Sequence, residues 1–476
     1  MARKQPGRET IPSASGTTWT TSKTLIAVAI GLFVLTRFYL LFFARPLISD
    51  MLMYYEYAIK AVDFHDTPYT EEFVVPYPPL AFWTTLAPRY FDDRRLASNR
   101  DPQIGAVFFG YDRAFRGTMF MCDLASFALL LLIVRKRRPQ LAPWAALLYV
   151  ITTTILGHVL YDRLDVALLF FLMAGMYCWT RSCDDSPWAI PWDILCYAVM
   201  GLGVSFKIIP ILCVPFFLLA DFYAPRRFLR LTCAAAVLVA TISVPFLIQW
   251  SATGPSVFGI FMFHAEREVH LESLYSSLMS VAAAFGSKIY ISQSHGAFNL
   301  SGDLAGTMKI ISSILLLGFL LAEGLWAVLR FSRLTRQDAY RMACYAVVGS
   351  VILAVVLSPQ YFIWAIPLVL LLAVEILPQG AARPLILASL LILVAATTTW
   401  VFPCNFFASQ QSQNPNALIP HNALNVQVPP NSMAASVLAL RNFAYLGVAV
   451  WLGVMLYNRI DRIPDFSKME TTKATK

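Results

Sequence analysis

Charged and hydroxylated side chains gather at the ends of long apolar runs, where they are costly unless they face water or a cavity. They are Asp50, Tyr161–Asp165, Lys207, His264–Ser273 and Ser358–Tyr361. The cations that could bind an anion are Lys207, Arg267, Arg163 and His264, and an arginine can grip two phosphate oxygens at once. Asp50 could take the proton of a hydroxyl nucleophile. These groups would suit an enzyme that moves a sugar from a lipid phosphate to a hydroxyl.

Aromatic side chains accompany these polar groups and suit sugar rings or an isoprenoid tail. They include Tyr54, Tyr55, Tyr57, Tyr77, Phe82 and Trp83. We predict one outward-facing polar cavity, with Asp50 as the catalytic base and the four cations near a phosphate. We assign the remaining lining of this cavity to Tyr54, Tyr77, Asp162, Asp165, Glu272, Gln360 and Tyr361.

Each of these features also has a simpler interpretation. Ser49 and Asp50 could only cap a surface helix. Asp162, Arg163 and Asp165 could form one solvated turn with a local ion pair. Lys207 could extend its ammonium to the membrane surface, and Pro76–Pro79 could be only a rigid turn.

The elements that position these residues follow from composition. Of 476 residues, 58% are hydrophobic and 14% charged, against about 45–50% and 25% in soluble domains. The class is therefore an all-α polytopic membrane protein of about twelve transmembrane helices, since a span needs about 20 apolar residues. The predicted spans are about 24–43, 115–134, 142–158, 163–180, 189–206, 208–222, 228–249, 305–329, 342–358, 361–377, 384–402 and 434–457. The fifth and sixth, separated by Lys207 and Pro210, could instead be one broken helix.

Residues outside the spans divide into a leader, two long loops and a tail. Residues 1–23 form a leader that we expect to be disordered, 24–457 the membrane domain, and 458–476 the tail. In the loop at about 44–114, residues 50–62 place Leu52, Tyr55, Ile59 and Val62 on one helical face. A second surface helix is expected to open at Pro78–Pro79. The other long loop covers about 250–304.

Basic residues set the orientation. With twelve spans, 22 of the 37 Lys and Arg fall on the side of the two termini, mostly in short loops, where positive charge marks the cytoplasmic face. We therefore expect a multi-pass cell-membrane protein with cytoplasmic termini and an outward-facing site. No soluble basic domain exists to bind nucleic acid. The eight cysteines show no metal-ligand spacing, so we expect no disulfide, metal or cofactor.

The order of these motifs resembles that of the GT-C membrane glycosyltransferases, and in detail glycosyltransferase family 87. The matching pieces are Ile48–Asp50, Pro76–Leu80, Asp162–Asp165, Phe206–Pro210, Arg267–Ser273 and Ser358–Tyr361. The resemblance implies a GT-C-like bundle and a polyprenyl-phosphate-mannose-dependent α-mannosyltransferase with Asp50 as base. The chain departs from relatives with paired acidic residues, because Met51 follows Asp50, and this departure weakens the case for a metal.

We therefore expect an enzyme that transfers mannose from a polyprenyl-phosphate donor to a glycolipid or glycan hydroxyl, with inversion. Its partners would be that donor, that acceptor and membrane lipids. One alternative is a lipid or sugar transporter or flippase, although such proteins usually show a repeat between halves and none is visible here. A second is a non-catalytic subunit of an envelope-polymer assembly.

Overall fold

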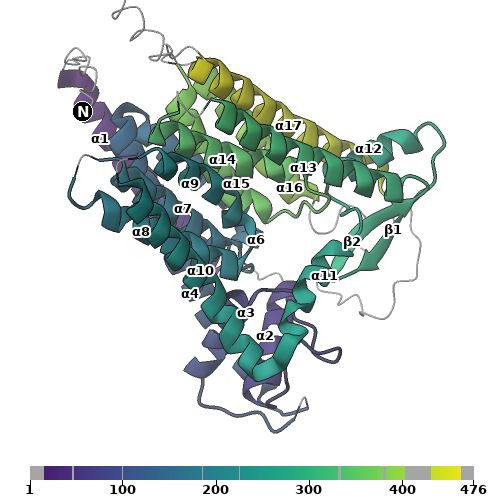
Figure 1. Ribbon diagram of the computed structural model, residues 1–476. Helices are drawn as coiled ribbons and strands as arrows, with labels where there is room; N and C mark the ends of the chain where they lie inside the picture. Colours follow the sequence, from purple (N-terminus) through teal and green to yellow (C-terminus); the bar gives the residue numbers. More distant parts are fainter. Residues whose placement is uncertain are drawn as a thin grey trace, which may run out of the picture.

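The computed structural model describes residues 16–44, 48–98, 100–184, 186–224, 226–330, 334–378, 382–401 and 430–461. Most of these residues are helical, and long helices lie side by side in one bundle, from whose lower end α2, α3 and α11 project (Figure 1). The all-α membrane class is confirmed. Cys404 and most of the predicted tail lie outside the described residues.

A helix occupies each of the twelve predicted spans. They are α1 (Gly16–Phe42), α4 (Ile104–Arg137), α5 (Ala142–Ile155), α7 (Asp165–Ser182), α8 (Ala189–Phe206), α9 (Val214–Phe222), α10 (Arg227–Thr253), α13 (Ala305–Leu329), α14 (Arg336–Leu353), α15 (Tyr361–Ile376), α16 (Ala382–Val401) and α17 (Ser432–Asp461). Seven of the described helical segments are long and apolar enough to cross a membrane alone. α14 and α15 are buried along nearly their whole length, as expected of helices that are surrounded by others.

The structure corrects the start of the first predicted span and decides between the two alternatives for the fifth and sixth spans. Helix α1 begins at Gly16, so the end of the predicted leader is helical rather than disordered. α8 ends at Phe206, Lys207 is extended, and the chain turns through the short helix η3 (Ile209–Leu212) into α9. The fifth and sixth spans are therefore two helices. Pro210 helps to separate them because it has no N–H to donate to the carbonyl of Phe206, so α8 cannot continue through it.

The first long loop is built from short helices. α2 (Ile48–Val62) and α3 (Pro79–Leu86) confirm both predicted surface helices, and η1 (Ala87–Phe91) follows α3. Three residues of the predicted apolar face of α2 are buried, namely Tyr55, Ile59 and Val62. Pro79 occupies the first position of α3, where its missing N–H costs no hydrogen bond.

The second long loop contains a hairpin that the sequence analysis does not predict. After η4 (Gly254–Phe258), α11 (Gly259–Ala265) and α12 (Leu274–Ala283), strands β1 (Ile289–Ser294) and β2 (Ala297–Gly302) pair antiparallel. The connecting His295 and Gly296 both have positive φ. Such a two-residue turn matches the twist of paired strands, so the His-Gly pair was the available signal.

The end of the bundle predicted to face the cytoplasm is tied together by ion pairs. Arg341 of α14 binds Glu375 at the end of α15 at 2.9 Å. Arg336 pairs with Asp193 and Asp221, from α8 and α9. The helices thus meet at this end through charged contacts, while Asp50 and its neighbours lie at helix ends on the opposite side.

Candidate active site

Asp50 lies in the first turn of α2, where the helix dipole favours a negative charge. Its carboxylate forms an ion pair with Arg163, and the two side chains are 17% and 13% exposed. Burial is the largest single influence on the pKa of Arg163 and would lower it, but attraction to Asp50, together with smaller contributions from Tyr54, Tyr77 and Asp165, leaves the pKa raised. Residues 113 positions apart are therefore paired at the start of α7.

Tyr77 lies beside this ion pair. Its hydroxyl is 3.3 Å from the hydroxyl of Tyr54, which is buried on α2 one turn after Asp50. Burial raises the pKa of Tyr77, and Asp50 adds to the shift. His264 Nε2 donates to the carbonyl of Pro76 at 3.0 Å. The proline-rich run is thus more than a rigid turn, because it connects the first long loop to α11 in the second.

The run Tyr161–Asp165 is not a solvated turn with a local ion pair. Asp162 and Asp165 are both buried. Asp162 accepts from Arg116 Nε of α4 at 2.7 Å, and Asp165 accepts from Lys207 Nζ at 2.7 Å. Each charge in this run is paired with a residue far away in sequence, so the alternative interpretation is wrong.

Lys207 does not extend freely to the membrane surface. Beyond its bond to Asp165, its ammonium lies 5.5 Å from the centre of the Tyr361 ring. Burial is the largest single influence on the pKa of Lys207 and would lower it, but attraction to Asp165, the hydrogen bond to Asp165 and smaller contributions from Tyr361 and Tyr77 together leave the pKa raised. Trp364 Nε1 also donates to Asp165 at 2.9 Å. Lys207 is therefore a charged, positioned ammonium that remains 20% exposed.

The segment after α11 carries one cation without a partner. Among the described residues, no hydrogen bond or ion pair ties Arg267 to another side chain or carbonyl. Partial burial and the charge of Arg267 lower the pKa of His264, and burial with the charge of Arg267 lowers the pKa of His270 to about 3. Both histidines are therefore neutral at pH 7.

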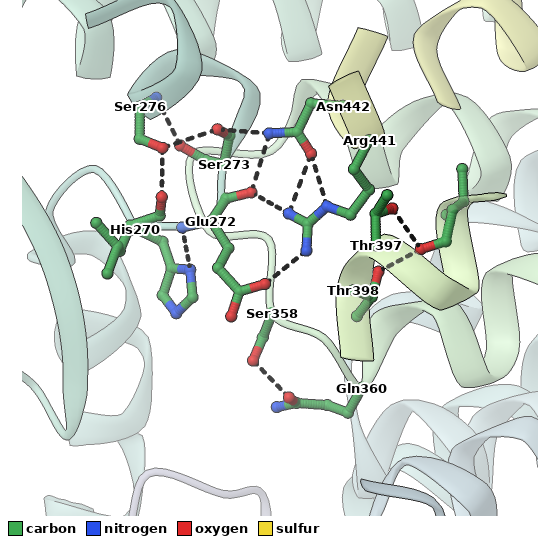
Figure 2. Close-up of polar contacts among 12 residues, drawn as sticks. His270, Glu272, Ser273, Ser276, Ser358, Gln360, Thr397, Thr398, Arg441 and Asn442 are labelled. Carbon is green, nitrogen blue, oxygen red and sulfur yellow. Dashed lines mark hydrogen bonds and ion pairs between the residues drawn. The ribbon is translucent and has the colours of Figure 1, made fainter. Parts of the chain in front are cut away.

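Glu272 is anchored in the protein. Its carboxylate binds Arg441 of α17, and Arg441 also donates to the Glu272 carbonyl (Figure 2). The side chains are 4% and 0% exposed. This placement favours a positioning role for Glu272 over the predicted contact with substrate. Gln360, another residue of the predicted lining, accepts a hydrogen bond from the hydroxyl of Ser358.

Arg441 and Asn442 were missed by the sequence analysis. Asn442 Nδ2 donates to the Ser273 carbonyl at 2.9 Å (Figure 2). It also donates to Ser277 Oγ at 2.9 Å. The guanidinium of Arg441 lies 5.3 Å from the Phe362 ring centre. An Arg-Asn pair inside a predicted span is costly unless it is satisfied, and that was the available signal.

Two cavities lie apart from this cluster. One, of about 390 Å³, is lined by Pro88, Phe91, Asp92, Asp93, Arg94 and Gly110. The other, of about 210 Å³, lies between α9 and α14 and includes Arg336. Within the part of the chain that the structure describes, no group of three or more His, Cys, Asp or Glu is arranged to hold a metal ion. The seven described cysteines are free thiols.

A comparison with sequence models of protein families shows to which family the chain belongs. The sequence model of Glycosyltransferase family 87 matches residues 76–359, more than half of the chain. The chain belongs to glycosyltransferase family 87. It is a membrane-embedded glycosyltransferase. The family match contains Tyr77, Arg163, Lys207 and Arg267, whereas Asp50 precedes it.

Two solved structures are similar to this family 87 member. ArnT from Cupriavidus metallidurans bound to undecaprenyl phosphate is 14% identical, with a TM-score of 0.44, covering 94% of this chain and 79% of that chain. The same protein in the apo state is 13% identical, with a TM-score of 0.45, covering 92% and 77%. Comparison with curated proteins gives no significant match.

Proposed function

We propose that this glycosyltransferase moves mannose from a polyprenyl-phosphate donor to a hydroxyl of a glycolipid or glycan. The observation that carries the proposal is the convergence of Asp50, Arg163, Tyr77 and Lys207 from four separated segments. Such a cluster supplies a base and cations at one end of the bundle. The donor's lipid tail would enter from the bilayer.

Asp50 acts as the general base in this proposal. The adjacent Arg163 guanidinium stabilises the carboxylate form, which is the form that accepts a proton. As the acceptor oxygen attacks the anomeric carbon, its proton passes to Asp50 and the bond to the phosphate breaks. The sugar is transferred in one step with inversion, and the leaving group is polyprenyl phosphate.

The leaving phosphate gains negative charge, and fixed cations stabilise that charge most strongly where water is scarce. Arg267 is the cation best placed to bind it, because no acidic side chain among the described residues neutralises it. Lys207 contributes a second contact, since Asp165 uses one of its three ammonium hydrogens. Arg163 is paired with Asp50 and is therefore not assigned to the phosphate. His264 is neutral and adds no positive charge; its hydrogen bond instead positions Pro76.

The site faces outward in this proposal, with both termini in the cytoplasm. The distribution of Lys and Arg in the short loops supports this orientation. Membership of a glycosyltransferase family argues against the transporter alternative.

Membranes that contain the protein test the function when they are supplied with labelled polyprenyl-phosphate mannose and candidate acceptors. Asp50→Asn should lower the transfer rate by about 10²–10⁴, the usual contribution of general-base catalysis, at an unchanged level of inserted protein. Asp66→Asn is the matched control, since Asp66 is exposed on the connection that follows α2. Normal turnover with poor insertion of Asp50→Asn would instead show that Asp50 only stabilises α2.

A further inference from the structure

The cavity beside η1 is a second binding site candidate on the same side as Asp50. It has a volume of about 390 Å³, within the range of small-molecule sites. Arg89 holds one lining residue, Asp92, in place by donating a hydrogen bond to its carbonyl. Arg89 is itself anchored to Asp63, directly after α2, by two hydrogen bonds of 2.8 Å. α2 therefore links this cavity to Asp50 over a length of about 20 Å.

One aromatic ring lines this cavity, that of Phe91, which is 80% exposed. Two further rings belong to chain neighbours of lining residues, namely Tyr90 and Phe109, and each is 64% exposed. At 1.5 Å per residue, Gly110 lies about 40 Å along α4 from its far end at Arg137, beyond the roughly 30 Å thickness of the hydrocarbon. The rings next to Gly110 are therefore placed to meet a ligand from water rather than lipid tails.

The charges around the cavity cancel. Asp63, Asp92 and Asp93 are balanced by Arg89, Arg94 and Arg95. No excess charge is present to attract a phosphate or a cation. Asp93 is exposed and, among the described residues, makes no hydrogen bond or ion pair, so its oxygens are available to accept from neutral hydroxyls.

We propose that this cavity binds a neutral oligosaccharide, namely a glycosyl unit of the acceptor several units away from the hydroxyl that reacts. The inference rests on the proposed function for the identity of the ligand as acceptor. The C–H face of a pyranose ring stacks on an aromatic face, whose charge is negative, and adjacent hydroxyls donate to Asp93. The site thus makes long acceptors bind more tightly than short ones.

Binding is tested without donor, in Asp50→Asn protein in lipid nanodiscs, by calorimetry with mannose, glucose, mannohexaose and neutral α- and β-glucan hexasaccharides. At least one hexasaccharide should bind more tightly than its monosaccharide. Phe91→Ala should weaken that binding by about two- to twelvefold. Gly110→Leu should weaken it too, because even a Cβ there would lie 3.0 Å from Asp92 Oδ2. Phe285→Ala, which removes an equally exposed ring on another loop, should change nothing.

Several results would overturn the proposal. The first is absence of binding to every hexasaccharide, and the second is equal hexasaccharide affinity in Phe91→Ala, Gly110→Leu and the wild type. The third is a loss of affinity in Phe285→Ala as large as that in Phe91→Ala. The fourth is quenching of a fluorescent probe at position 91 by nitroxide-labelled lipids, which would show that this position contacts lipid tails. In a transfer assay, Phe91→Ala should raise KM for a long acceptor and leave kcat unchanged. If no acceptor is glycosylated at all, the proposed function fails while the binding measurement still decides the subsite.

Discussion

The ion pair between Lys207 and Asp165 allows the proposed contact of Lys207 with the donor phosphate to be tested. Asp165 is 2% exposed and Lys207 20% exposed, so Lys207→Gln leaves a buried carboxylate without its cation. Removal of one partner of a buried pair costs about 3–5 kcal/mol. We therefore expect Lys207→Gln to be clearly less stable, a loss that would hide any effect on the donor.

The double variant Asp165→Asn/Lys207→Gln separates the two roles. It removes both charges, and the amide oxygen introduced by Asp165→Asn can still accept from Trp364 Nε1, so stability should return close to that of the wild type. Donor affinity should remain weakened, because the loss of a charge-assisted hydrogen bond costs about 1.5–3 kcal/mol, or roughly ten- to hundredfold.

Two measurements on detergent-purified protein decide this prediction. Thermal unfolding followed by size-exclusion chromatography gives the order of stability, and single-turnover transfer from labelled donor gives the affinity. A double variant that binds donor like the wild type would refute the phosphate contact and leave Lys207 a structural partner of Asp165. A fully stable Lys207→Gln would refute the buried ion pair itself.

The other predictions concern topology, metal and α17. Cysteines introduced at Ala106 and Ser294 should react with an impermeant reagent in intact cells and one at Gln140 should not; the reverse pattern would overturn the outward-facing site. Transfer should survive EDTA, because a single carboxylate is a poor site for a hard divalent cation, and inactivation that magnesium or manganese restores would contradict this. Arg441→Gln should destabilise the protein by about 3–5 kcal/mol, with recovery when Glu272→Gln is added, as measured by thermal unfolding; no destabilisation would show that the pair contributes little.

Much of the architecture could be predicted from local sequence alone. Long apolar runs specify spans because a helix must satisfy its backbone hydrogen bonds within the membrane. The start of α3 at Pro79 and the buried face of α2 follow from proline chemistry and from helical periodicity. The hairpin at 289–302 was missed because its strands are short and its only turn signal was His295–Gly296.

The sequence by itself predicted a cluster of polar residues at the ends of the spans and, through the order of those spans, the end of the bundle at which they gather. Tertiary structure alone decided their partners. Lys207 bonds Asp165 from 42 positions away, and Glu272 bonds Arg441 from 169 positions away. Helix packing decides these pairs. A buried charge is costly unless it is paired with an opposite charge, and the packing determines which oppositely charged side chains of neighbouring helices lie at the same depth. Arg267 differs from Lys207 and Arg163 in forming no ion pair among the described residues, and the linear sequence, in which Glu266 and Glu268 flank it, carries no sign of that difference.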